Sequence, residues 1–205
     1  MRNAILHAAL SGVALLLAAC SSTRPIATPA TLDVAAAPVL ASTVFPAIAQ
    51  QKAYAPFEDR AGRSHRTLTP TLDPDGLEIR IVDEAGDERL LRLLRAADGS
   101  VLLAAAIEDG KTTLFDPPLV YMPSALGPGQ EFEATTDVRV VDARGREQSR
   151  GTAVRRLRHA GTASIDWESA GSQATVLEGV LDLDLPPARA ITTTTLWVTH
   201  DGIER

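Results

Sequence analysis

The sequence predicts a single all-β domain in which one antiparallel sheet is strongly curved, as a half-barrel or a barrel. Three observations support this. Runs of alternating apolar and polar residues recur between residues 77 and 199, turn residues separate these runs at short intervals, and no long stretch has helical periodicity. A long meander twists and has to protect its edges, so a curled sheet is favoured over a flat one. A β-sandwich is the alternative, and a short helix is compatible with the pattern.

The first strands of this meander follow from a period of two. Leu77, Ile79 and Ile81 alternate with polar residues, which places all three on one face of a strand. A shorter strand over residues 64–69 precedes them. Residues 88–95 fit a strand and also a helical face, but the segment is short and lies between two turns, so a strand is favoured.

Two Asp-Gly pairs mark the next turns. Asp98-Gly99 precedes a strand predicted over residues 101–107, and Asp109-Gly110 separates that strand from residues 112–115. Asp-Gly is typical of a type I′ turn, which needs positive φ at both central residues. We expect Asp116-Pro117-Pro118 to break the ladder next, because proline has no backbone donor.

The second half contains the clearest strand of the sequence. Residues 123–129 form an irregular crossing between the two halves of the sheet. In residues 131–140, Phe132, Val138 and Val140 share a dry face while charged residues occupy the other face. Further strands are expected over residues 147–157, 162–168, 173–185 and 191–199.

The first twenty residues have the features of a secretory signal. Arg2 gives a positive start, residues 4–19 carry no charge, and small residues precede Cys20, the only cysteine. The apolar run is too short for a spanning helix. We expect a signal peptide over residues 1–19, a Pro/Ala/Thr-rich tether over residues 20–56 and the β-domain over residues 57–205. Apolar residues in the tether leave open a segment docked on the domain.

The sequence Leu17-Ala18-Ala19-Cys20 resembles the lipobox of bacterial lipoproteins. By that resemblance Cys20 is the lipidation site, a diacylglycerol is attached to its thiol, and acylation of the new amino group adds a chain such as palmitate. Two or three chains hold a protein firmly on a membrane. The resemblance, with Ser21 instead of Asp after Cys20, implies the periplasmic face of an outer membrane; the surface of a Gram-positive membrane is the alternative.

The composition limits the classes of partner that we expect the protein to bind. The chain has 26 acidic and 20 basic residues and a net charge of −6, and loss of the signal would also remove Arg2. Nucleic acid is therefore not an expected partner, because phosphate backbones need concentrated positive charge. With Cys20 lipidated, no thiol remains for a disulfide or for a cysteine nucleophile, so the stability of the domain depends on burial.

We expect no catalytic residue, cofactor or metal ion. The sequence has no Gly-x-Ser-x-Gly, no Gly-rich phosphate loop, no His-Glu-x-x-His and no paired cysteines. Asp182 and Asp184 lie two apart on a predicted strand and project from one face, together with Glu178, as two carboxylates of a hydrolase would. The wet side of a solvent-facing strand explains the same residues.

A basic cluster lies inside this acidic protein. Guanidinium groups match phosphate bidentately, so the cluster is a candidate surface for anionic lipid or an acidic envelope protein. A solvated face in which each arginine pairs with a neighbouring carboxylate is the alternative. The cluster consists of Arg144, Arg146, Arg150, Arg155, Arg156 and Arg158.

A second resemblance rests on turns and prolines. In their order, Phe115-Asp116-Pro117-Pro118, Met122-Pro123 and Gly127-Pro128-Gly129 resemble a group of uncharacterised bacterial envelope proteins, which are thought to share the curved sheet of lipoprotein carriers. The resemblance covers residues 77–203. It implies the curved sheet and no functional residue.

Together these observations favour a non-enzymatic lipoprotein anchored in the outer membrane, with a β-domain that binds a lipidic or protein partner of the envelope. A concave sheet lined by apolar side chains could hold acyl chains. A structural or assembly factor of the cell envelope is one alternative, and a periplasmic hydrolase that uses acidic residues on a strand is the other.

Overall fold

The computed structural model describes a chain made almost entirely of strands. It describes Thr31 and residues 36–46, 50–54, 64–70, 76–82, 86–165, 172–199 and 202–203. In order, the elements are β1 (Val39–Leu40), α2 (Ala41–Val44), β2 (Gln50–Tyr54), β3 (Ser64–Pro70), β4 (Gly76–Val82), β5 (Glu88–Arg95), β6 (Val101–Glu108), β7 (Lys111–Met122), β8 (Ala125–Leu126), β9 (Glu131–Asp142), β10 (Glu147–Ile165), β11 (Ser172–Leu185), β12 (Ala188–Thr199) and β13 (Gly202–Ile203).

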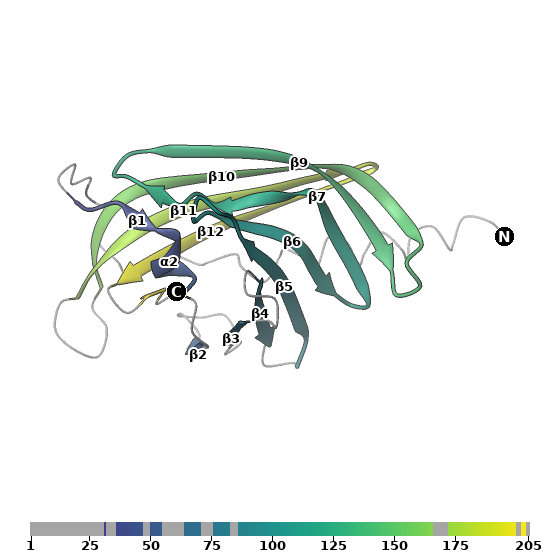
Figure 1. Ribbon diagram of the computed structural model, residues 1–205, viewed down its shortest axis with the longest axis horizontal. Coiled ribbons are helices and arrows are strands. Elements are labelled where there is room, and N and C mark those ends of the chain that lie inside the picture. Colours follow the sequence, from purple (N-terminus) through teal and green to yellow (C-terminus); the bar gives the residue numbers. More distant parts are fainter. Residues whose placement is uncertain are drawn as a thin grey trace.

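Eleven of the described strands form one antiparallel sheet that curls into a half-barrel (Figure 1). Its order is β13-β12-β11-β10-β9-β7-β6-β5-β4-β3-β2, so each strand lies beside its neighbour in the chain. The exception is β8, which leaves the sheet between β7 and β9 and pairs with β1. The predicted curved meander is confirmed, and no second packed sheet of a β-sandwich occurs within the described residues.

Irregular pairing helps to explain why the sheet curves. The register shifts between Arg92 and Leu93, between Leu103 and Ala105, between Glu147 and Ser149, and between His159 and Gly161. An extra residue in one strand of a pair bends that strand and increases the local right-handed twist. The shifts therefore bend the meander at several places along the sheet.

One face of the sheet, called here the inner face, carries the main hydrophobic core. Alternation places one residue in two on this face, and these side chains are almost fully buried. The core draws on every strand from β4 to β12. Its members from these strands are Leu77, Ile79, Leu93, Val101, Leu103, Phe115, Leu119, Met122, Leu126, Val138, Val140, Ala153, Leu157, Leu177, Leu181, Leu183, Leu185 and Val198.

A short stretch of the chain, residues 39–45, lies against the inner face, and we call it the inner segment. It contains β1, α2 and Phe45, and Figure 1 shows it inside the arch of the sheet. Val39, Ala41, Val44 and Phe45 are buried in the main core. Of the two arrangements that the sequence left open for this part of residues 20–56, the docked one therefore applies to the inner segment.

Few polar contacts hold the inner segment. Leu40 pairs with Ala125 in the two-residue β1–β8 ladder. Beside it, the backbone N–H of Ala41 donates to the carbonyl of Ser124 over 3.0 Å. From the sheet, Arg95 Nη2 donates to the carbonyl of Phe45 over 2.5 Å. A two-residue ladder is marginal by itself, so burial of the apolar side chains holds the segment in place.

Beyond the register shift at His159, the outer face of the sheet also carries buried side chains. His159 pairs with Leu177, but Gly161 pairs with Val176, so Ala160 is the extra residue. Val176 and Leu177 point to opposite faces, and residues on the outer face therefore become buried here. They form a second cluster of Ala163, Ala174, Val176 and Trp197.

Turn chemistry agrees with the sequence at one Asp-Gly pair and differs at the other. Asp109 and Gly110 have φ of 50° and 68°, as the predicted type I′ turn requires. At the earlier pair only Gly99 has positive φ. The Asp98 carboxylate accepts hydrogen bonds from the backbone N–H and the hydroxyl of Ser100, which favours a longer turn.

The structure corrects two predicted strand limits. β7 continues through Pro117 and Pro118, because its pairing with β9 ends at Asp116 and its pairing with β6 resumes at Leu119. The missing proline donors therefore fall where no ladder bond is needed. β10 is one strand from Glu147 to Ile165, because the extra residue Ala160 absorbs the irregularity that suggested two strands.

The substitution Gly151→Ala tests the closest backbone approach in the sheet. A Cβ at Gly151 would lie 1.7 Å from the carbonyl oxygen of Asp184 and 2.8 Å from its carbonyl carbon, so β10 and β11 would have to separate. We expect the free energy of unfolding to fall by about 2–3 kcal/mol, measured by urea denaturation. The control is Thr152→Ala, at an exposed neighbouring position. Equal urea midpoints for the two variants would contradict the steric argument.

Candidate functional site

The structure does not bring the six arginines of the predicted basic cluster onto one surface. Arg156 and Arg158 lie exposed on the outer face, where they pair with Glu133 and Glu178 over 2.5 and 2.6 Å. Each pair joins neighbouring strands of the sheet. Exposed pairs of this kind contribute little stability, but they neutralise the charge that the sequence suggested for a patch.

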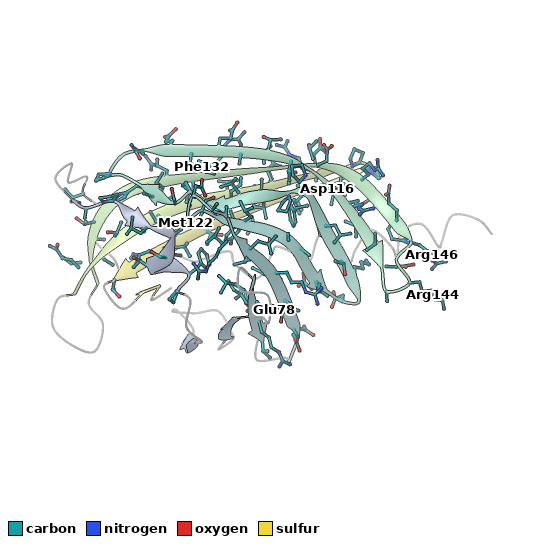
Figure 2. All side chains as sticks on the ribbon, viewed as in Figure 1. Glu78, Asp116, Met122, Phe132, Arg144 and Arg146 are labelled. Atoms are coloured by element: carbon teal, nitrogen blue, oxygen red, sulfur yellow. The ribbon has the colours of Figure 1, made fainter. Side chains whose placement is uncertain are left out.

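Three more members of the cluster lie at or near the β9–β10 turn. Arg146 pairs with Asp142 over 2.7 Å, and Arg150 pairs with Glu147 over 3.0 Å. Figure 2 shows Arg144 and Arg146 at the tip of this hairpin, far from Met122 and Phe132. The partner-binding role of the cluster stays a prediction, now for a narrow tip instead of a broad face.

The sixth member, Arg155, lies on the opposite side of β10 and is buried in the inner face. Only 2% of its surface is exposed, and it stands between Ala153 and Leu157 on that face. Its guanidinium lies 4.7 Å from the centre of the Tyr121 ring, and its Nε donates to the Tyr121 carbonyl over 3.3 Å. Burial lowers the pKa of Arg155, because the charged form loses water.

A glycine makes room for this guanidinium. A Cβ at Gly179, on the adjacent strand β11, would lie 2.7 Å from both Nη1 and Nη2 of Arg155. Any other residue at this position would therefore displace the charged group. The absence of a side chain at Gly179 and the ring of Tyr121 together define the place that the guanidinium occupies.

No carboxylate pairs with Arg155 among the residues that the structure describes. Elsewhere on the sheet arginines have such partners, as Arg89 has Glu108 over 2.7 Å and Arg189 has Asp182 over 2.5 Å. The contacts of Arg155 are an aromatic face and one backbone carbonyl. A buried cation without a counter-ion is costly, so this is the most unusual electrostatic feature of the inner face.

The inner segment contacts the same site. The ring of Phe45 meets the ring of Tyr121 edge-on, with 6.0 Å between their centres. Tyr121 thus stands between the inner segment and Arg155. Displacement of the inner segment would remove one contact of the ring on which the guanidinium rests.

His159 is a second unusual polar group on the inner face. It is fully buried, and neither Nδ1 nor Nε2 has a hydrogen-bond partner. Its backbone is well held, since its N–H donates to the Gln130 carbonyl and its own carbonyl accepts from the N–H of Gly129. Burial lowers the pKa of His159, so the neutral imidazole is favoured in the folded protein.

A half-buried ion pair lies at the end of the β6–β7 hairpin. Arg89 donates to Glu108 Oε1 from Nε and Nη2 over 3.1 and 2.7 Å, whereas Glu108 Oε2 is buried without a partner. Burial raises the pKa of Glu108, and the Arg89 guanidinium opposes that shift. The remaining lone pairs of this carboxylate are therefore unsatisfied.

The acidic residues on β11 do not form an open pair of carboxylates. Arg189 binds Asp182 in a two-bond fork over 2.8 and 2.5 Å, and this hydrogen bonding lowers the pKa of Asp182. Asp184 is exposed, and Glu178 is paired with Arg158. One carboxylate of the predicted pair is thus occupied by a cation and buried, and only Asp184 faces solvent.

Several sequence features lie outside the described residues or leave no trace in them. Cys20 and the rest of residues 1–30 are outside them. Within the described part, no group of three or more His, Cys, Asp or Glu side chains could hold a metal ion. No helix there has the length and hydropathy needed to cross a membrane.

No protein-family model matches the chain, and neither a curated protein nor a solved structure matches it. The candidate site therefore rests on geometry alone. It consists of the apolar inner face, the inner segment that covers part of it, and the contacting side chains of Phe45, Tyr121 and Arg155.

Sequence reasoning grouped Arg155 with the wrong neighbours. Proximity in sequence placed it with Arg156 and Arg158, but alternation gives it the parity of the apolar residues Ala153 and Leu157. A period of two along β10 could therefore have separated this residue from the exposed arginines. Its contacts with Tyr121 and Gly179 had no sequence signal, since they depend on the pairing of distant strands.

His159 makes the stability of the fold depend on pH. Its pKa in the folded protein lies below its ordinary value of 6.5, so the unfolded chain binds more protons below that pH. We expect the free energy of unfolding to fall by up to about 1 kcal/mol per pH unit as the pH drops below 6.5, measured by urea denaturation. The variant His159→Leu should lack this component.

The comparison between the parent and His159→Leu isolates the effect. Glu108 acts in the opposite direction, because its raised pKa means that its contribution is lost as the pH rises through that pKa. Both proteins contain Glu108 and all the other histidines, so these contributions cancel in the difference. Parallel pH profiles for the two proteins would show that His159 does not titrate as described.

Proposed function

We propose that this protein is a lipoprotein anchored through Cys20 to the periplasmic face of an outer membrane, and that its half-barrel binds a lipidic partner on the inner face. The single observation that carries the binding proposal is the cover of that face. A large apolar surface is covered in part by a short piece of the same chain, the inner segment, which is itself held by few polar contacts.

Burial of the inner segment and burial of an acyl chain on the inner face contribute comparable free energies. Full burial of a side chain such as Val39, Val44 or Phe45 contributes about 1.5–3 kcal/mol. Each buried methylene of an acyl chain contributes about 0.8 kcal/mol. A chain of roughly ten methylenes would therefore replace the burial that these side chains lose. Exchange of one cover for the other would break the β1–β8 ladder and the hydrogen bond from Arg95 to the Phe45 carbonyl.

The anchor supports the same function. A lipidated Cys20 would hold the domain beside a membrane, which is the source of lipidic partners. The stretch between Cys20 and Val39 contains three prolines, which disfavour helix and ladder. The inner segment thus follows closely on the anchor in the chain. By this proposal the part of the chain that leads from the membrane is also the cover of the binding face.

A structural or assembly factor of the envelope is the second candidate, and the β9–β10 tip favours it. The side chains of Arg146 and Arg150 are 66% and 70% exposed at this end of the sheet. A protruding hairpin with exposed guanidinium groups suits contact with an acidic protein. Crosslinking in cells distinguishes the two candidates, since a dominant protein partner without bound lipid would favour the second one.

The substitution Cys20→Ala tests the anchor. We expect it to abolish incorporation of labelled fatty acid and to move the protein from the membrane to the soluble fraction, because the thiol would be the point of attachment. The measurement is metabolic lipid labelling with fractionation, beside the parent chain. Retained labelling, or unchanged membrane attachment of the variant, would overturn the lipidation of Cys20.

A disulfide that locks the inner segment tests the binding face. Leu40 and Ala125 lie opposite each other in the β1–β8 ladder, and both are exposed. Because the neighbouring residues Ala41 and Ser124 are joined by a backbone hydrogen bond, Leu40 and Ala125 form a non-hydrogen-bonded pair, in which the side chains lie closer together. We place Leu40→Cys and Ala125→Cys in the full chain with Cys20→Ala. The oxidised form should bind the neutral probe dodecanol at least about tenfold more weakly than the reduced form, measured by titration calorimetry.

The controls for the lock are the two single variants, each in the Cys20→Ala chain. They should bind dodecanol as tightly as the chain that carries Cys20→Ala alone, and a thiol reductant should not change their affinity. If the oxidised double variant binds dodecanol with undiminished affinity, the inner segment is not the cover of the binding face. If no form of the protein binds dodecanol, the lipidic part of the proposed function fails.

A further inference from the structure

The buried guanidinium of Arg155 specifies more than an apolar partner. Arg155 is 98% removed from solvent but makes no ion pair within the described part of the chain. A planar cation in such a place is stabilised by an oxyanion, which can accept two parallel N–H bonds. The Tyr121 ring lies against the guanidinium, and the Tyr121 carbonyl accepts from its Nε. Within the described part of the chain, neither Nη1 nor Nη2 donates to a protein acceptor.

We propose that Arg155 receives the anionic head of an amphiphile, a carboxylate or a phosphate that carries an acyl chain. This inference rests on the proposed function and adds the class of ligand to it. The head binds the Nη groups of Arg155, and the chain replaces the inner segment on the inner face. Arg155 and Phe45 of the inner segment both contact the ring of Tyr121. The head and the acyl chain of such a ligand would therefore bind on either side of this ring.

A free anion fits this place poorly. Arg155 lies in the inner face among Ala153, Leu157 and Leu181, which offer no polar group to an ion. A small anion would have to leave water without any apolar burial in return. An amphiphile differs, because burial of its chain offsets the desolvation of its head. The apolar surroundings and the lone cation together favour a ligand with both properties.

The unpaired charge also predicts how the empty protein behaves. A buried cation without a counter-ion destabilises the fold, so its replacement by an apolar side chain of similar length is neutral or stabilising. Arg155→Met should therefore have a urea midpoint equal to or above that of the parent, while its response to anionic ligands is lost. A purely structural arginine would show the reverse, a lower midpoint with unchanged ligand preference.

The experiment compares heads on one chain length. Laurate, dodecyl phosphate and dodecanol are titrated into the full-length protein by calorimetry, at a pH where the acids are ionised, with acetate as a head without a chain. We expect the parent to bind laurate or dodecyl phosphate at least about tenfold more tightly than dodecanol, because hydrogen bonds to a charged group contribute about 1.5–3 kcal/mol. Acetate should bind far more weakly than laurate.

Three variants locate this preference. Arg155→Met should bind the anionic ligands and dodecanol equally. Gly179→Ala keeps the charge but places a Cβ 2.7 Å from both Nη atoms, so the preference should decrease without the loss of Arg155. The matched control is Arg156→Met, on the outer face and next in sequence, which should keep the full preference.

The outcomes separate this inference from the function on which it rests. Equal affinities of the parent for laurate, dodecyl phosphate and dodecanol would overturn the anionic head and leave the lipidic function intact. Acetate binding as tight as that of laurate would overturn the amphiphile in favour of a free anion. Failure of dodecanol and both acids to bind would remove the proposed function and the inference together. A preference that persists in Arg155→Met would assign the head to another residue.

Discussion

A single sheet with one apolar face has to cover that face, and the rest of this structure follows from that constraint. Apart from the two-residue β1–β8 ladder, the described chain provides no second sheet, and it provides no long helix as a partner layer. The sheet reduces the problem by curling, so that side chains from β4 and β11 join one core. What curvature leaves uncovered, the inner segment covers with a few apolar side chains. The domain is therefore one curved sheet whose inner face is covered in part by a short segment of the same chain.

The two faces of the sheet place their arginine side chains in different environments. On the outer face, ion pairs cross between neighbouring strands, as between Arg156 and Glu133 and between Arg158 and Glu178. These pairs keep the face polar and are screened by solvent. On the inner face the same type of side chain, Arg155, is enclosed by apolar neighbours and an aromatic ring. One strand, β10, thus carries solvated and desolvated arginines side by side.

The sequence predicted the parts of the fold that depend on local pattern. Alternation identified the sheet strands between β4 and β12 but not the edge strand β2, which falls within the predicted tether. Asp109-Gly110 identified a type I′ turn because both of its residues adopt positive φ. What it missed depends on distant pairing. The continuity of β7 through Pro117 and Pro118 follows from where its two partners begin and end. The burial of Arg155 and the docking of the inner segment depend on contacts between residues far apart in the chain.

Beyond the extra residue Ala160, the sheet buries side chains on its outer face as well as on its inner face. On β11 and β12 the inner core includes Leu177 and Val198, with Leu196 packed against it, whereas Val176 and Trp197 belong to the outer cluster. The two cores are separated by the thickness of one sheet. An indole in the outer cluster is shielded by the backbone from whatever occupies the inner face. In a chain whose other tryptophan, Trp167, is replaced, emission from Trp197 would therefore report the integrity of the far end of the sheet and serve as an internal reference for folding during binding experiments.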